Sequence, residues 1–341
     1  MARLTEEQIR MQLNKAAAKE KETQVTFDDI DSFGNRESLM AALKSISSYN
    51  KMLEQRITLI NEPLTATVPF TRENLYLFCA FTGSGKSTVA ANISLPLWKQ
   101  GKKVLVIANE EPQHDILFRI GCLDLGLNFN DYKKGKMANE DQLRVAKLFP
   151  EISKFVKILD VTYRDGLTTK VEGIKSALNS VKDKDYSCVL IDYYQLIKYS
   201  VSDPQKTSYD NLNDLRLWMG QYIKSSNVPI VLFAQLYSSG KKGGVKDIDA
   251  RIKECSAVVE PATVIIEVVP NFEAQTTDFI IHKDRFGFQG HRITCGFEKG
   301  RYTKISPEEA IMRASQGKLK KANEDLDKIE GIIFSEDSDA S

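Results

Sequence analysis

The stretch CAFTGSGKST, residues 79–88, decides the fold class of this chain. It has the spacing of a phosphate-binding loop: a small residue, four residues of any type, and then Gly-Lys-Ser. The apolar run NLYLFCA precedes it and the helical pattern KSTVAANISLPLW follows it, which is the strand–loop–helix context that the motif requires. A chance glycine-rich turn is the alternative, and the two matching flanks argue against it. The sequence therefore predicts a nucleotide phosphate site here.

The residue types in this loop suit a bound nucleoside triphosphate and Mg²⁺. Gly83 and Gly85 let the backbone turn inward, so that successive N–H groups point at phosphate oxygens. The helix that begins near Lys86 adds its positive end, and the lysine is expected to reach the β and γ phosphates. The Ser87 hydroxyl is expected to ligate Mg²⁺. The expected nucleotide-binding residues are Ala80, Gly83, Ser84, Gly85, Lys86, Ser87 and Thr88.

Short apolar runs alternate with amphipathic helical patterns on both sides of the loop. NLYLFCA, KKVLVIAN, FVKILDV, YSCVLIDY and VPIVLFAQ read as strands buried on both faces. This alternation predicts an α/β fold with a mostly parallel sheet flanked by helices. After Ala262, the runs ATVIIEVVP, TTDFIIHK and HRITCGF follow with short links, which predicts antiparallel strands appended to the sheet.

One of the intervening segments, TTKVEGIKSALNSV, shows the helical spacing clearly. Its first residues, Thr168 or Thr169, are expected to cap the helix. The apolar side chains expected on one side of this helix are Val171, Ile174, Leu178 and Val181.

Segments of different composition flank the α/β core, which is expected over residues 63–305. Residues 1–62 read as a helical N-terminal arm without strand signals. Residues 306–341 begin with Ser306 and Pro307, which suit the start of a helix, and end in an acidic tail.

Overall composition excludes several classes of protein. The formal net charge of the 341 residues is +1, so any nucleic-acid contact must come from local patches. The five cysteines form no CxxC pair and there are only three histidines, which argues against a zinc site or a disulfide framework and favours the cytoplasm. No apolar run approaches the roughly 18 residues of a membrane span.

Acidic and amide side chains end three of the expected strands. Asp192 ends YSCVLID, where a carboxylate beside the phosphate loop would hold Mg²⁺ through water, although it could also simply cap a loop. Glu110 and Glu111 follow VLVIAN and could orient the attacking water, or could only begin the next helix. Gln235 ends VPIVLFAQ and could sense the γ-phosphate, or could be an ordinary strand-end residue.

Taken together, NEEP, VLIDYYQLI, NVPIVLFAQL and HKDRFG resemble the ATPase domain of hexameric replicative DNA helicases of the DnaB family (superfamily 4), in a compact bacteriophage-type form. The resemblance covers about residues 63–305. It implies a RecA-like fold, an ATP-hydrolysing ring, movement along single-stranded DNA, and 5′–3′ polarity. By this resemblance, Lys86 and Ser87 would bind nucleotide and Mg²⁺, and Asp192 would be the acid on the metal side. Glu110, rather than Glu111, would be the catalytic glutamate, and Gln235 would sense the γ-phosphate. Lys283 and Arg285 would form a basic pair that reaches into the neighbouring subunit's site.

Two segments are candidates for contact with DNA. The first, YSSGKKGGVKD, is rich in glycine and lysine, which suits the phosphates of a single strand. The second, ARIKECSAVVEPAT, resembles the family's DNA-contacting segment, but it has Cys-Ser where Ser-Gly is common. Both could instead be solvated linkers. The expected DNA-contacting residues are Lys241, Lys242, Lys246, Lys253, Glu254 and Ser256.

The resemblance also leads to expectations about partners. A helix at about residues 36–61 would dock on the adjacent subunit. About 60 residues before the core are too few for a collar or primase domain, so primase would be a separate partner, with a polymerase or loader as further candidates. A recombinase-like or KaiC-like ATPase, or an assembly factor that does not unwind DNA, is the alternative function.

Overall fold

The computed structural model describes residues 40, 44, 60–164, 166–182, 184–192, 195, 197, 208–226, 228–236, 248–252 and 256–318. The chain divides into two units, Met1–Gln55 and Arg56–Ser341, and the elements described below belong to the second. The predicted arm over residues 1–62 and the predicted tail beyond residue 318 lie almost entirely outside the described residues.

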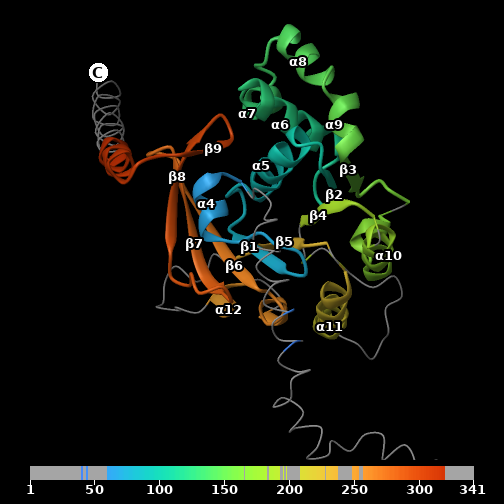
Figure 1. Cartoon of the computed structure of the whole chain (residues 1–341). Helices are drawn as coiled ribbons and strands as arrows, with labels where there is room; N and C mark the ends of the chain where they lie inside the picture. The colour runs from blue at the N-terminus through green and yellow to red at the C-terminus, as the bar shows by residue number, and fades with distance from the viewer. Residues whose placement is uncertain are drawn as a thin grey trace, which may run out of the picture. The chain divides into compact units, whose positions relative to one another are not determined.

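A nine-stranded sheet forms the centre of the second unit, with the strand order β3-β2-β4-β5-β1-β6-β7-β8-β9 (Figure 1). The sequence predicted an α/β fold with a mostly parallel sheet, and the structure confirms it. The strands are β1 (Leu75–Ala80), β2 (Lys103–Ala108), β3 (Val156–Asp160), β4 (Tyr186–Asp192), β5 (Ile230–Gln235), β6 (Val264–Asn271), β7 (Thr276–Asp284), β8 (Arg292–Glu298) and β9 (Arg301–Lys304).

The strands after Ala262 pair as the sequence predicted. β6 pairs with β7, β7 with β8 and β8 with β9, all in antiparallel orientation. On its other edge, β6 pairs in parallel with β1, which joins these strands to the parallel part of the sheet. The sequence indicated no partner for that edge, because short links constrain only consecutive strands. That partner, β1, lies far away in the sequence.

Helices cover both faces of the sheet (Figure 1). On one face lie α5 and α6, and on the other lie α10 and α11. The helical elements are α4 (Glu62–Thr67), α5 (Lys86–Lys99), α6 (Gln113–Leu125), α7 (Phe129–Lys133), α8 (Asn139–Ala146), α9 (Phe149–Phe155), η2 (Leu167–Thr169), α10 (Val171–Val181), α11 (Ser208–Ser225), α12 (Ile248–Arg251), η5 (Ser256–Val259) and the helix at 307–318.

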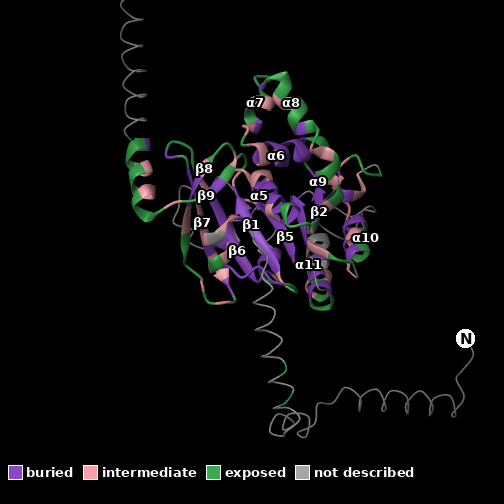
Figure 2. Cartoon of the chain, turned by 45° about the horizontal axis from the view of Figure 1, so that its top comes forward, coloured by how far each residue is buried: buried purple, intermediate pink, exposed green. Residues whose placement is uncertain are grey.

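Alternating residues of the central strands supply two hydrophobic cores. Tyr76 and Phe78 of β1 point into the core beneath α5, whereas Leu75 and Leu77 point into the core above α10 and α11. All residues of β1 are buried, and Figure 2 shows the central strands as buried ribbons. Because burying each such side chain contributes about 1.5–3 kcal/mol, the two cores fix the strand ends where the candidate site lies.

The helix α10 confirms one prediction and corrects another. The four apolar residues that the sequence placed on one side of this helix are buried. However, its N-cap is Lys170 without a side-chain hydrogen bond, because both threonines are used elsewhere. Thr168 donates to the Asp160 carbonyl at 3.1 Å, and Thr169 donates to the Gly166 carbonyl at 2.8 Å.

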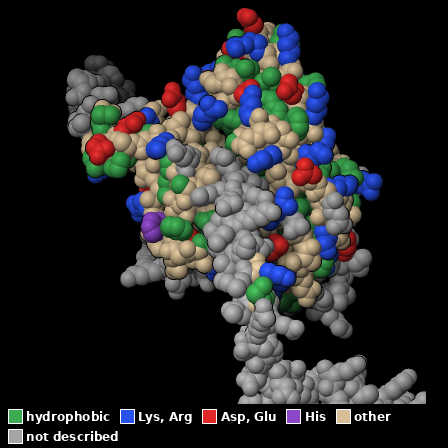
Figure 3. All heavy atoms as spheres, in the orientation of Figure 1, with side chains coloured by type: hydrophobic (Ala, Val, Ile, Leu, Met, Phe, Trp, Pro, Cys, Tyr) green, Lys and Arg blue, Asp and Glu red, His purple; other side chains and the backbone are tan. Residues whose placement is uncertain are grey.

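The helices α7 and α8 project beyond α6 and share a small apolar cluster with it, whereas α9 packs against β2 and β3. Figure 3 shows Lys and Arg side chains gathered over this region, with acidic side chains among them. Both signs of charge occur here, with exposed basic residues outnumbering exposed acidic ones. The exposed charged residues of this region include Lys133, Lys134, Lys136, Arg144, Lys147, Glu140 and Glu151.

Candidate active site

The loop between β1 and α5 has the backbone conformation that its glycines predict. Gly83 and Gly85 adopt φ angles of 75° and 92°, in the left-handed region that favours glycine. Gly85 is the N-cap of α5, so Lys86 and Ser87 occupy the first turn of that helix. The free N–H groups of a helix N-terminus therefore face the loop, as a phosphate site requires.

A pocket of about 290 Å³ opens above this loop. The strand ends of β2 and β5 contribute Glu110, Glu111 and Gln235 to its lining. The hairpins of β6–β9 form another wall, which includes Phe272 and Tyr302. Ala80 is the buried last residue of β1, beneath the loop. The expected nucleotide-binding residues that line the pocket are Gly83, Ser84, Gly85, Lys86, Ser87 and Thr88.

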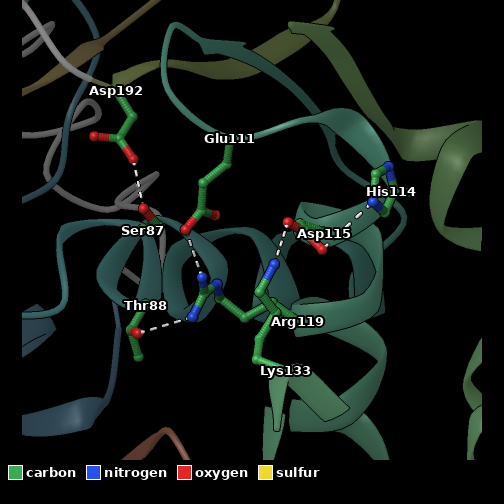
Figure 4. Close-up of polar contacts among 8 residues, drawn as sticks. All are labelled: Ser87, Thr88, Glu111, His114, Asp115, Arg119, Lys133 and Asp192. Atoms are coloured by element: carbon green, nitrogen blue, oxygen red, sulfur yellow. Dashed lines mark hydrogen bonds and ion pairs between the residues drawn. The ribbon is translucent and has the colours of Figure 1, made fainter. Parts of the chain in front are cut away.

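Asp192, at the end of β4, lies against the first turn of α5. Its Oδ2 accepts a hydrogen bond of 2.8 Å from the Ser87 hydroxyl (Figure 4). Burial raises the pKa of this carboxyl to about 6, even though the Ser87 hydrogen bond and the Lys86 charge lower it. Its other oxygen, Oδ1, is buried and has no hydrogen-bond partner among the described residues.

These oxygens fit the Mg²⁺ that the fold implies. Mg²⁺ prefers hard oxygen ligands and is usually held by one or two protein groups plus substrate phosphates. A hydroxyl and a carboxylate oxygen without a partner provide such a donor set beside the phosphate loop. The same contact makes a purely loop-capping role for Asp192 a poorer description of the site.

The acidic pair after β2 is divided between two environments. Pro112 is the N-cap of α6, so Glu110 and Glu111 precede that helix and are not part of it. Glu111 forms an ion pair with Arg119, in which Glu111 Oε1 accepts a hydrogen bond of 2.6 Å from Arg119 Nη2 (Figure 4). Glu110 is exposed and lines the pocket.

Arg119 is a site residue that the sequence reasoning missed. It lies on α6, lines the pocket, and its Nη1 is 3.5 Å from the Thr88 hydroxyl (Figure 4). Its guanidinium also lies 4.0 Å from the centroid of the Phe129 ring. The available signal was a lone cation within the apolar stretch ILFRIGCL, where an unpaired charge would be costly.

Gln235 lies where the sequence predicted, at the end of β5 and on the pocket lining. Its side-chain amide donates a short hydrogen bond to the hydroxyl of Thr82, within the phosphate loop. Gln195, from the run IDYYQL, donates to the Gln235 carbonyl at 3.0 Å and accepts from the Gln235 N–H at 3.3 Å. The sequence reasoning gave no role to Gln195.

Lys283 and Arg285 lie apart from this pocket. Lys283 Nζ donates to the carbonyls of Val259 and Glu260, at 2.9 and 3.0 Å. Arg285 Nη2 is 3.4 Å from the same Glu260 carbonyl, and its side chain is exposed. Both basic residues therefore occur on one side of the strand end, as alternation along the strand predicts.

The candidate DNA contacts fall mainly outside the described residues. Ser256 is described and begins the short helix η5. The other candidates, Lys241, Lys242, Lys246, Lys253 and Glu254, lie outside the described residues.

Arg251 and His282 surround the buried carboxylate of Glu267. Glu267 of β6 accepts hydrogen bonds of 2.9 and 2.5 Å from Arg251 and one of 2.7 Å from the His282 ring. Burial raises the pKa of Glu267, but the hydrogen bonds from His282 and Arg251 and the Arg251 charge outweigh it. Its pKa therefore lies below the ordinary value. Arg251 also lies 5.7 Å from the ring of Phe81, at the start of the phosphate loop.

The sheet order, the phosphate loop and the carboxylate opposite it define the class of this protein as a RecA-like P-loop ATPase. Within that class, the model of the DnaB-like helicase C-terminal domain matches residues 64–306. The chain belongs to this family, which makes it an ATP-driven helicase of the replicative type.

Solved structures share the fold. The ATPase domain of a phage helicase matches with a TM-score of 0.63 and 18% identity, covering 80% of this chain and 100% of that one. A DnaB-like replicative helicase, whose interactions with primase were described, matches with a TM-score of 0.63 and 18% identity, covering 86% of this chain and 71% of that one. A KaiC-like protein from the archaeon Pyrococcus horikoshii OT3 has a TM-score of 0.49 and 15% identity, covering 74% and 99%.

No curated protein sequence matches the chain. None of the helices in the described part of the chain combines the length and the apolar character that crossing a bilayer requires.

Proposed function

We propose that this chain is the motor subunit of a hexameric ring that moves 5′–3′ along single-stranded DNA and unwinds duplex DNA during replication. Family membership supports the helicase class. One observation supports the ring. The phosphate loop, Glu110, Glu111 and Gln235 line one pocket, whereas Lys283 and Arg285 lie outside the lining that the described residues form, where they could serve a neighbouring subunit.

Within one subunit, Lys86 and the loop N–H groups would bind the phosphates of ATP or another NTP. Ser87 and Asp192 would hold Mg²⁺, which supplies charge neutralisation of the phosphates when bound. Glu110 would orient the attacking water, because it lines the pocket whereas Glu111 is already engaged by Arg119. Arg119 would hold the Glu111 side chain in place and add positive charge beside the phosphates.

Between subunits, Lys283 and Arg285 would complete the neighbouring site. Both cations lie at the end of β7, where Lys283 bonds the carbonyls of Val259 and Glu260 while Arg285 is exposed and makes one longer contact. A cation supplied in trans stabilises the charge of the transferring phosphoryl group and can contribute about 10³–10⁵ in rate.

Gln235 would report loss of the γ-phosphate to the DNA segments. It contacts the phosphate loop through Thr82, and the segment with Lys241, Lys242 and Lys246 begins two residues later. Lys253, Glu254 and Ser256 would form a second contact with the strand. Such cationic loops bind phosphates without reading base sequence.

Further parts of the proposal concern organisation and partners. Residues 1–62 would form the arm that links subunits, 63–305 the ATPase domain, and 306–341 a helix and an acidic tail. Ser306 accepts from the Glu309 N–H at 3.1 Å, which supports the start of that helix. Primase would be a separate partner, a polymerase or loader a further one, and the host cytoplasm the place of action.

The test is a forked duplex opened by the purified protein with Mg-ATP, together with ATP hydrolysis measured with and without single-stranded DNA. The proposal predicts that DNA stimulates hydrolysis, that the fork is opened, and that closed rings form. Open filaments on DNA without fork opening would favour a recombinase instead. Assembly with no fork opening and no filaments would favour an assembly factor.

A further inference from the structure

Gln195 lies beside the end of β5, on the edge that faces β4. The parallel pairing of β4 with β5 extends in register to Ile191 opposite Leu232. On its other edge, β5 pairs with β1 as far as Gln235 opposite Ala80. The side-chain amide of Gln195 then bonds both the N–H and the carbonyl of Gln235, at 3.3 and 3.0 Å. It therefore supplies hydrogen bonds to β5 on the β4 side, three residues beyond the last β4–β5 pair.

This contact fixes the backbone from which the Gln235 side chain reaches the phosphate loop. Gln195 is only 8% exposed, so its hydrogen bonds compete little with water. The Gln235 side chain bonds Thr82 of the loop. One short segment of chain therefore carries both Asp192, which bonds Ser87, and the amide that holds Gln235.

We propose that Gln195 is a positioning residue that joins the metal-side strand end to Gln235, so that nucleotide state and DNA binding influence each other. The inference rests on the proposed function. Gln195 touches neither phosphate nor DNA in this account. It acts by keeping the Gln235 backbone at a fixed place relative to Asp192, so that a movement of the loop at Thr82 passes to the residues after Gln235.

A purely structural role makes a different prediction. In that case, loss of the amide would leave the backbone N–H and carbonyl of Gln235 without hydrogen-bond partners and would lower the stability of the fold. The ratio of DNA-stimulated to unstimulated hydrolysis would not change. The two roles can therefore be separated by measuring that ratio together with nucleotide affinity and the melting temperature.

The test uses Gln195→Met in the full chain, with Gln221→Met on the exposed face of α11 as the matched control. Methionine keeps the length of the side chain and removes both hydrogen bonds. We expect affinity for a fluorescent ATP analogue to change by less than about twofold. Stimulation by a dT oligonucleotide should fall about tenfold, the factor that corresponds to losing one to two net hydrogen bonds. The control should match the wild type.

A double-mutant cycle with Gln235→Ala makes the test specific. If Gln195 acts through Gln235, Gln195→Met has little further effect on stimulation in the Gln235→Ala background. An unchanged tenfold effect in that background would overturn the inference. If Gln195→Met does not fold, Gln195→Glu serves in its place. It keeps the acceptor for the N–H, loses the donor to the carbonyl, and should give an intermediate loss.

Failure of the inference can be told apart from failure of the proposed function. A wild-type protein that DNA does not stimulate would refute both. A stimulated wild type, with Gln195 variants equal to the Gln221→Met control, would refute the inference alone.

Discussion

Replacing Glu267 with leucine should destabilise the protein strongly, because it leaves the largely buried Arg251 cation without its carboxylate partner. The side chains of Glu267, Arg251 and His282 are 5%, 17% and 21% exposed, and two of the three hydrogen bonds join Glu267 to Arg251. Removing one partner of a buried ion pair costs about 3–5 kcal/mol. We expect a value near 3 kcal/mol, since the partial exposure of Arg251 admits some water.

A triple replacement separates charge from packing. Arg251→Met, Glu267→Leu and His282→Leu together remove all three polar groups, and such exchanges are often neutral or stabilising by about 1–4 kcal/mol. Denaturation by urea, with Glu298→Leu as an exposed strand control, measures the free energies of unfolding. A Glu267→Leu cost no larger than that of the control would refute the reasoning.

The wild type and Glu267→Leu should also differ in how their free energies of unfolding depend on pH. The pKa of Glu267 is lower in the folded protein than in the unfolded chain, where it is about 4.3. The unfolded state therefore binds the proton more strongly, and the stabilisation is complete above that pH. It is lost as the pH falls through the lower pKa of the folded state. The stability difference between wild type and Glu267→Leu should shrink below about pH 4, and a growing difference would contradict the account.

Two further predictions concern glycines within helices and the candidate DNA loop. Gly173→Ala should lower the melting temperature markedly, because an added Cβ would lie 1.9 Å from the Leu167 carbonyl oxygen. Gly220→Ala, also within a helix but with nothing within 4 Å of its Cβ, should instead stabilise by about 0.5–1 kcal/mol. Neutralising Lys241 and Lys242 should weaken binding of single-stranded DNA and reduce its salt slope by about 1.4, with hydrolysis in the absence of DNA unchanged. An unaltered salt slope would remove these lysines from the interface.

Local signals allowed the sequence to predict the phosphate loop and the strands around it. The loop needs only adjacent residues: glycines at two positions of positive φ and a lysine at a helix start. Continuous apolar runs likewise indicate the buried strands. The position of Asp192 could be predicted because it is the last residue of one such strand. These features depend on short stretches of chain, which the sequence displays directly.

Features made by distant residues could not be predicted in the same way. The parallel pairing of β6 with β1 depends on which strand edge remains open after the other strands have paired. The contacts of Gln195 with Gln235 and of Arg251 with Glu267 join residues 40 and 16 positions apart. Nothing in the local pattern around a single glutamine or arginine indicates such a partner.

The central claim is that each ATP is cleaved between two copies of this chain. Lys86→Ala and Arg285→Ala should each abolish turnover when purified alone, while Arg285→Ala should still bind nucleotide. Mixed in equal amounts, they should regain up to about a quarter of wild-type hydrolysis, because random assembly pairs an intact phosphate loop with an intact Arg285 at about that fraction of interfaces. Full activity of Arg285→Ala alone, or a mixture as inactive as its parts despite mixed rings, would contradict the account.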